Sequence, residues 1–241
     1  MKLNVGRTLV LTLALGSAML AGSAQAQDTN SYLYLAHAAS GRNISSGTNP
    51  EVPIDVSVNG TCIAEGLSFG EIRGPFAIHA ATEAFRVSKA NAELPCSEPA
   101  IFTANSAMAA TVTYVGVVSL DNSNNITGQL YPANLTPLAV GQTRALVVNA
   151  THQNLSSTIT YEPRTDGSGG QFPIPAGSIK AGAAPPGVTF VSIYSTGTNT
   201  LQAGPISIQT LKRNVYIYVL AGSATNGTVQ LLGPKVVWGV Y

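Results

Sequence analysis

Charged residues are scarce in this chain of 241 residues, where Lys, Arg, Asp and Glu together make up 10%. Soluble globular domains typically carry about 25%. Lys and Arg are scattered along the sequence, and only Lys212 and Arg213 are adjacent. A nucleic-acid-binding domain usually gathers a basic excess on one face. The sequence therefore argues against a nucleic-acid partner.

Residues that commonly carry chemistry are also few, with three histidines and two cysteines. A zinc site needs at least three converging ligands, and neither His37, His79 nor His152 has a His or Cys at ligand spacing. No G-x-S-x-G nucleophile elbow is present, and the glycine-rich run 167–170 lacks the Lys-Ser/Thr of a phosphate-binding loop. We therefore expect no catalytic residue set, no metal site and no cofactor.

The turn cluster 121–125 (DNSNN) offers oxygen atoms that suit calcium. It contains one carboxylate and lacks the bidentate Glu that ends an EF-hand loop. A solvated turn is the interpretation that we favour over a calcium site.

The N-terminus predicts an export signal over residues 1–26. Lys2 and Arg7 make a basic start, an uncharged and mostly apolar run follows over 8–20, and Ala24-Gln25-Ala26 matches the A-x-A cleavage pattern. The apolar run is too short for a bilayer, which needs about 20 residues, so a buried helix or an anchor is the weaker alternative. We expect cleavage after Ala26 and no lipid anchor, because Ser23 stands where a lipoprotein needs Cys. The mature chain would be periplasmic, surface-bound or secreted, with no membrane span.

The two cysteines, Cys62 and Cys96, both fall in the first half of the mature chain. An even pair in an oxidising compartment predicts a disulfide. A metal site or a reactive thiol is the alternative, and neither cysteine has the neighbours that a zinc site requires.

Short strands separated by turn signals predict an all-β fold. Residues 54–58 (IDVSV) alternate strictly and are followed by Asn59-Gly60, a strong hairpin signal. Residues 111–120 (TVTYVGVVSL) form a β-branched run without a polar break, which is typical of a central strand. The composition, rich in Gly, Ser, Thr and Asn, agrees with strands and turns.

The order of these elements recurs in the second half. Residues 144–150 correspond to 32–38, 157–161 to 54–58, 188–194 to 85–88, and 215–220 to 113–118. We therefore predict two Ig-like antiparallel β-sandwich domains in tandem after the signal peptide. Their predicted bounds are 27–130 and 143–241, with a Pro- and Gly-containing linker over 131–142.

The first half resembles the DUF4397 family of exported bacterial Ig-like domains of unknown function, over residues 32–120. The resemblance rests on His37-Ala38 in the opening strand, on residues 54–60 (IDVSVNG) and on residues 67–70 (LSFG). An insertion at 41–50 and the Cys pair depart from the family pattern. The resemblance implies export and a β-sandwich, and it supplies no catalytic residues.

His37 and Asp55 fall at recurrent polar positions of this pattern, on strands that we expect to lie close together. One hypothesis is a His–Asp pair that orients a nucleophile. The hypothesis that we favour is a structural polar pair that fixes the opening strand through a buried hydrogen bond.

These observations predict an exported, non-catalytic cell-envelope or secreted protein. It would act by surface binding or structural interaction with an envelope, protein or carbohydrate partner, for instance by accepting a partner's strand at a sheet edge. The alternative is a hydrolase or enzyme accessory whose site lies between the domains.

Overall fold

The computed structural model describes residues 29–39, 52–121, 123, 125–135, 143–151, 157–161, 170–184, 186–223 and 228–237. Every regular element in these ranges is a β-strand, which confirms the all-β prediction. The first eight strands are β1 (Asn30–His37), β2 (Ile54–Val58), β3 (Thr61–Leu67), β4 (Ile72–His79), β5 (Thr82–Lys89), β6 (Ala100–Ala107), β7 (Thr113–Leu120) and β8 (Ile126–Ala133). The other eight are β9 (Thr143–Asn149), β10 (Ser157–Tyr161), β11 (Gly170–Ile174), β12 (Ile179–Ala184), β13 (Gly187–Ser195), β14 (Leu201–Thr210), β15 (Val215–Ala221) and β16 (Gln230–Val237).

The strands form four sheets of four strands, and the second eight strands repeat the arrangement of the first eight. We call β1–β8 the first unit and β9–β16 the second unit. Each unit has an inner sheet, β4-β1-β7-β8 or β12-β9-β15-β16, and an outer sheet, β3-β2-β5-β6 or β11-β10-β13-β14. Adding eight to each strand number converts one unit into the other, so the strand correspondences expected from the sequence are confirmed.

The Asn59-Gly60 turn shows why β2 and β3 form a hairpin. Asn59 has φ 49° and Gly60 has φ 80°, the pair of positive φ angles that a type I′ turn requires. This turn matches the twist of the strands that it joins, β2 and β3, which pair antiparallel with Val58 opposite Thr61.

The inner sheets are mixed, because each contains one parallel pair. β1 runs parallel to β7, and β9 runs parallel to β15, whereas the other pairings are antiparallel. All seven residues of β15 are buried. A strand that is covered on both faces has apolar residues at successive positions. This explains the continuous apolar sequences of 113–120 and 215–221.

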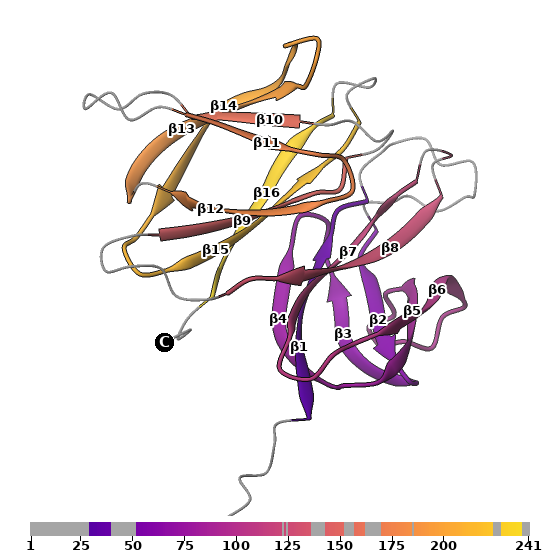
Figure 1. Ribbon diagram of the computed structural model, residues 1–241. Coiled ribbons are helices and arrows are strands. Elements are labelled where there is room, and N and C mark those ends of the chain that lie inside the picture. The colour runs from indigo at the N-terminus through magenta and orange to yellow at the C-terminus, as the bar shows by residue number, and fades with distance from the viewer. Residues whose placement is uncertain are drawn as a thin grey trace, which may run out of the picture.

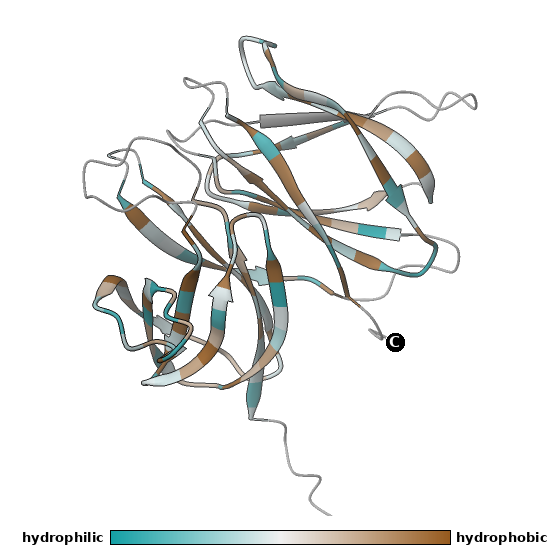
Figure 2. Cartoon of the chain, turned by 180° about the vertical axis from the view of Figure 1, so that it is seen from behind, coloured by the Kyte–Doolittle hydropathy of each residue, from teal (hydrophilic) through white to brown (hydrophobic). Residues whose placement is uncertain are grey.

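Three apolar cores lie between the four sheets. Figure 1 shows how the strands of the two units are arranged, and Figure 2 shows that hydrophobic residues recur along these strands. The first core lies between outer and inner sheets of the first unit and includes Leu33, Val56 and Val87. The second unit has the equivalent core, which includes Val147 and Ile193.

The third core lies between the two inner sheets and joins the units. Its buried residues include Ala36 and Val117 from the first unit and Val148 and Ile217 from the second. The contacts are reciprocal, since β4 lies against β16 while β8 lies against β12. The units therefore pack face to face through an apolar layer.

Strand β8 extends into the stretch predicted as the linker. β8 continues to Ala133, three residues into the linker predicted over 131–142, and Tyr131 is buried in the third core. Residues 136–142 lie outside the described part of the chain.

Candidate functional site

Asp55 anchors the connection between β5 and β6. Strand β2 turns Ile54, Val56 and Val58 toward the core of the first unit, so Asp55 faces outward, yet it is only 1% exposed. Its Oδ1 accepts a hydrogen bond from the Gly66 amide at 2.7 Å. Its Oδ2 accepts bonds from the amides of Asn91 (3.2 Å) and Cys96 (2.8 Å). The connection over residues 90–99 thus covers the outer face of β2.

Arg86 and the disulfide hold the same connection. Arg86 pairs with Ser57 in the neighbouring strand and donates hydrogen bonds to the carbonyl oxygens of Cys96, at 2.6 Å, and of Glu98. Cys62 on β3 is bonded to Cys96, with their Cα atoms 5.8 Å apart, which confirms the predicted disulfide. These side chains are therefore engaged with the main chain or with each other.

His37 is fully buried at the end of β1, and its Nε2 lies 3.2 Å from the Val52 carbonyl oxygen. Its ring meets Phe69 edge-on, with the centroids 5.9 Å apart. His37 belongs to an inner sheet, whereas Asp55 belongs to an outer sheet and faces away from the core between them. The expected His37–Asp55 hydrogen bond is thus replaced by separate main-chain partners, because the alternation of β2 directs Asp55 to the opposite face.

The structure describes only some of the other sequence candidates, and it brings none of those together. His79 is exposed at the end of β4, and both His152 and residues 167–169 lie outside the described part. Asp121 accepts hydrogen bonds from the amides of Ser123 (2.8 Å) and Asn125 (2.9 Å), which is the bonding of a closed turn. Within the described ranges, no group of three or more His, Cys, Asp or Glu is placed to hold a metal ion. A search of the same residues finds no helix with the length and apolarity needed to cross a membrane.

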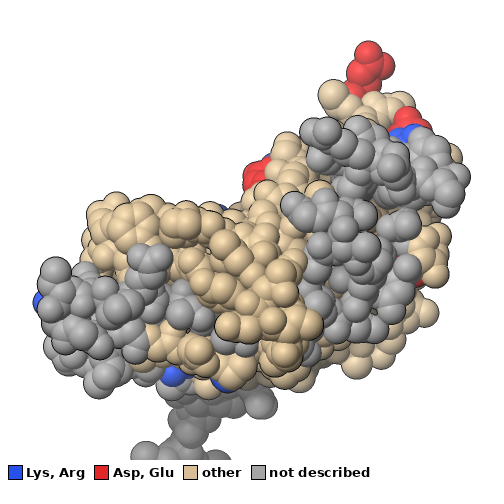
Figure 3. Space-filling view, turned by 90° about the horizontal axis from the view of Figure 1, so that it is seen from above, with Lys and Arg blue, Asp and Glu red and all other residues tan. Residues whose placement is uncertain are grey.

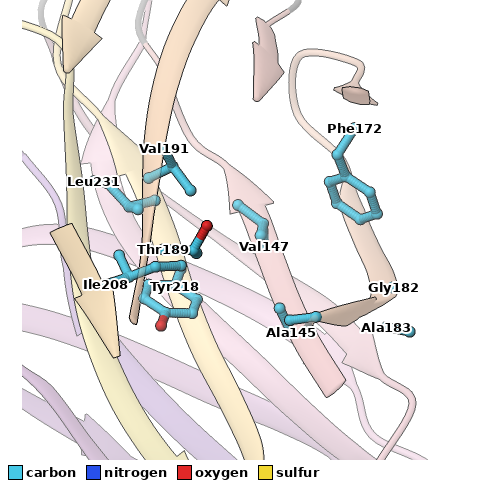
Figure 4. A pocket seen from close by; sticks show the side chains of 11 residues that line it. Ala145, Val147, Phe172, Gly182, Ala183, Thr189, Val191, Ile208, Tyr218 and Leu231 are labelled. Atoms are coloured by element: carbon cyan, nitrogen blue, oxygen red, sulfur yellow. The ribbon is translucent and has the colours of Figure 1, made fainter. Parts of the chain in front are cut away.

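A cavity opens between the two sheets of the second unit (Figure 4). It leaves about 50 Å³ of interior space, within a hollow of about 520 Å³ that includes its opening to solvent. The lining is almost entirely apolar, and it consists of Ala145, Val147, Phe172, Gly182, Ala183, Ala184, Thr189, Val191, Ile208, Tyr218 and Leu231.

Tyr218 is the unusual member of this lining. It is 2% exposed, and its hydroxyl has no hydrogen-bond partner among the described residues. Burial, with a smaller contribution from Tyr216, raises the pKa of Tyr218 to about 12, so the group is a neutral hydroxyl at pH 7. Buried tyrosine hydroxyls usually find a partner, as the hydroxyl of Tyr131 does with Gln129 Oε1 at 3.1 Å.

The first unit has a smaller cavity at the corresponding place, with about 40 Å³ of interior space. Gly116 holds the position of Tyr218 there, since Gly116 pairs with Leu35 and Tyr218 with Val147. A Cβ on Gly116 would lie 3.0 Å from both Leu35 and Leu130, so leucines occupy the space that Tyr218 fills. The second cavity thus combines an apolar wall with two buried residues that carry hydroxyls, Tyr218 and Thr189, whereas the hydroxyl at the first cavity belongs to half-buried Ser106.

An exposed apolar surface lies on the outer sheet of the second unit. Val188 is 53% exposed and Phe190 is 47% exposed, two residues apart on β13, and Leu201 at the start of β14 is 51% exposed. Charged side chains are few and scattered on the face seen in Figure 3. In this unit the connection between the two strands is the short stretch 196–200, in contrast to the fixed connection 90–99 of the first unit.

No protein-family model matches the chain, and no curated protein matches it. The fold defines an all-β, sandwich-like protein with repeated units. The DUF4397 resemblance and the Ig-like character of the units stay predictions.

Sequence reasoning missed Tyr218, Arg86 and the exposed pair on β13. The signal for Tyr218 is visible in hindsight, because residues 215–221 (VYIYVLA) place a tyrosine where residues 113–119 (TYVGVVS) have a glycine. Alternation places Val188 and Phe190 on one face of a strand, but it does not tell which face is covered.

Proposed function

We propose that this is an exported, non-catalytic protein of the cell envelope or the medium that acts by binding a partner through its surface. The observation that carries the proposal is the exposed pair Val188 and Phe190 on the outer face of β13. Side chains of this kind are favoured at the centres of protein interfaces, where aromatic residues are enriched and charges are depleted. A weakly charged partner, such as an envelope protein or a glycan, suits this surface.

The polar side chains support a structural role for the first unit. Asp55, Arg86 and Cys96 are used to hold the connection 90–99. A catalytic group needs atoms directed at a substrate, whereas both oxygens of Asp55 are bonded to main-chain amides. We therefore assign the first unit the role of a rigid scaffold. The exposed apolar surface lies on the second unit.

The alternative, a hydrolase or accessory with a site between the units, has no supporting observation in the described residues. The layer between the inner sheets is an apolar core, and Asp55 lies on the far side of an outer sheet from it.

The binding proposal is tested with the double variant Val188→Ser/Phe190→Ser. Both residues are about half exposed, so we expect a stability loss of no more than about 1–2 kcal/mol. Envelope extract is cross-linked to immobilised wild-type protein, and captured components are compared with those of the variant. We expect the variant to lose the components that wild type enriches.

Leu94→Ser is the matched control, because Leu94 is 65% exposed on the connection 90–99 of the first unit. It should capture the same components as wild type. Equal capture by the β13 variant, or equal loss in the control, would contradict the assignment of the surface. Export is tested separately by mass spectrometry of protein from the envelope or medium, which should begin at Gln27; a mature chain that retains Met1 would count against it.

A further inference from the structure

We propose that the cavity of the second unit is a binding site for a small, mainly apolar molecule that carries one hydrogen-bonding oxygen. The hydroxyl of Tyr218 would bond that oxygen while the apolar part lies between the sheets. This site is independent of the surface-binding role proposed above, because it lies inside the sandwich rather than on β13's outer face.

The shape and chemistry of the cavity select this class of ligand. Aliphatic side chains from both sheets, such as Val147 and Leu231 facing Val191 and Ile208, enclose the space. Half-buried Phe172 lies at the wall, where a Cβ on Gly182 would come within 2.5 Å of its ring. No charged residue lines the cavity, so it favours a neutral molecule.

The unpartnered hydroxyl is the second, independent observation. A phenylalanine at position 218 would fill the same volume without burying an unpaired polar atom. Two other buried tyrosines, Tyr131 and Tyr216, have bonded hydroxyls. The cavity of the first unit, with Gly116 at this position, has no tyrosine in its lining. A ligand oxygen accounts for both the tyrosine and its missing partner.

The test uses two probes of nearly equal shape, p-cresol and toluene, which differ by one hydroxyl. Each is titrated into the purified full-length mature protein, and methyl resonances are followed by NMR. We expect saturable shifts at Val147, Val191 and Leu231, with p-cresol binding at least about threefold tighter than toluene, as one added hydrogen bond provides.

Two variants distinguish the contribution of the cavity wall to binding from that of the Tyr218 hydroxyl. Tyr218→Phe should remain folded, since its hydroxyl has no partner to lose, and should bind both probes equally. Ala145→Leu should fill the cavity and abolish binding of both. Ala104→Leu fills the first unit's cavity instead and should leave binding unchanged.

The proposal is overturned by any of three results. The first is no saturable shift with either probe. The second is a shift confined to methyls of the first unit, such as Leu35 and Val87. The third is an unchanged preference for p-cresol in Tyr218→Phe.

Discussion

Tyr114 and Tyr216 hold the same place in the two units, and each hydroxyl accepts a hydrogen bond from the main-chain amide five residues earlier. The donors are Ala109 at 3.0 Å and Leu211 at 2.6 Å. Each bond closes the turn that leads into a central strand, β7 or β15. A similar tyrosine corner occurs in immunoglobulin-type sandwiches. The repetition extends from the strand order to single hydrogen bonds.

Tyr216→Phe should lower the free energy of unfolding by about 1–2 kcal/mol, because it leaves the Leu211 amide without its acceptor. Tyr114→Phe should cost less, since the bond at Ala109 is exposed and water can replace the hydroxyl. Urea denaturation of both variants measures the difference. Equal losses would show that solvent access does not set the value of this bond.

Asp55→Asn should destabilise the protein by about 2–4 kcal/mol and release the connection 90–99. The amide nitrogen of Asn cannot accept the bonds that a carboxylate oxygen accepts from main-chain amides, and bonds to charged groups are the stronger ones. Hydrogen exchange at the amides of Asn91 and Cys96 should accelerate. Glu93→Gln, at an exposed carboxylate on the same connection, is the control and should change neither quantity. Unchanged hydrogen-exchange protection of these amides in Asp55→Asn would show that Asp55 does not anchor the connection.

Removal of the disulfide by Cys62→Ala/Cys96→Ala should cost about 3–4 kcal/mol, because the bond closes a loop with a sequence separation of 34 residues. The unfolded chain would expand, so the denaturant slope should also increase. Reduced wild-type protein should behave like the double variant. A loss below about 1 kcal/mol would mean that Asp55 and Arg86 hold this region without the cross-link.

Alkaline pH should destabilise the protein through its buried tyrosines. Burial raises the pKa of both Tyr131 and Tyr218 to about 12, whereas unfolded tyrosine has a pKa near 10. Because the pKa is higher in the folded protein than in the unfolded chain, the stability associated with each neutral tyrosine is fully present below pH 10. It is lost as pH rises toward 12. Each tyrosine should lower stability by about 1.4 kcal/mol per pH unit in that window.

The measurement is urea unfolding at several pH values between 9 and 11.5, with Tyr218→Phe as the comparison. The variant should lose stability less steeply than wild type. Identical slopes would mean that Tyr218 ionises in the folded protein as readily as in the unfolded one.

Local patterns were enough to predict much of the fold. Alternation over 54–58 and the Asn59-Gly60 signal specify a hairpin through backbone preferences alone. The unbroken apolar run over 215–220 predicts a strand buried on both faces, but the pattern does not say what covers the second face. That cover is the inner sheet of the other unit, which is distant in sequence.

The sites were harder to predict, because they too depend on contacts between residues that are distant in sequence. Asp55 is recognisable as a polar residue in an apolar strand, yet its partners lie 11, 36 and 41 residues away. The cavity depends on how side chains from seven strands fill a shared space, and the exchange of Gly116 for Tyr218 has meaning only once the register is known.

The reciprocal packing of the inner sheets has the form of a twofold-symmetric homodimer contained within one chain. Each unit presents the same face to the other, so the contact of β4 with β16 is mirrored by that of β12 with β8. Self-complementary contacts of this kind are the rule in symmetric dimers. Because the two units belong to one chain, their contact does not depend on protein concentration, as the contact of two separate protomers would. Within this repeated frame the units differ in single residues, since the first carries the disulfide and the second carries Tyr218 where the first has Gly116.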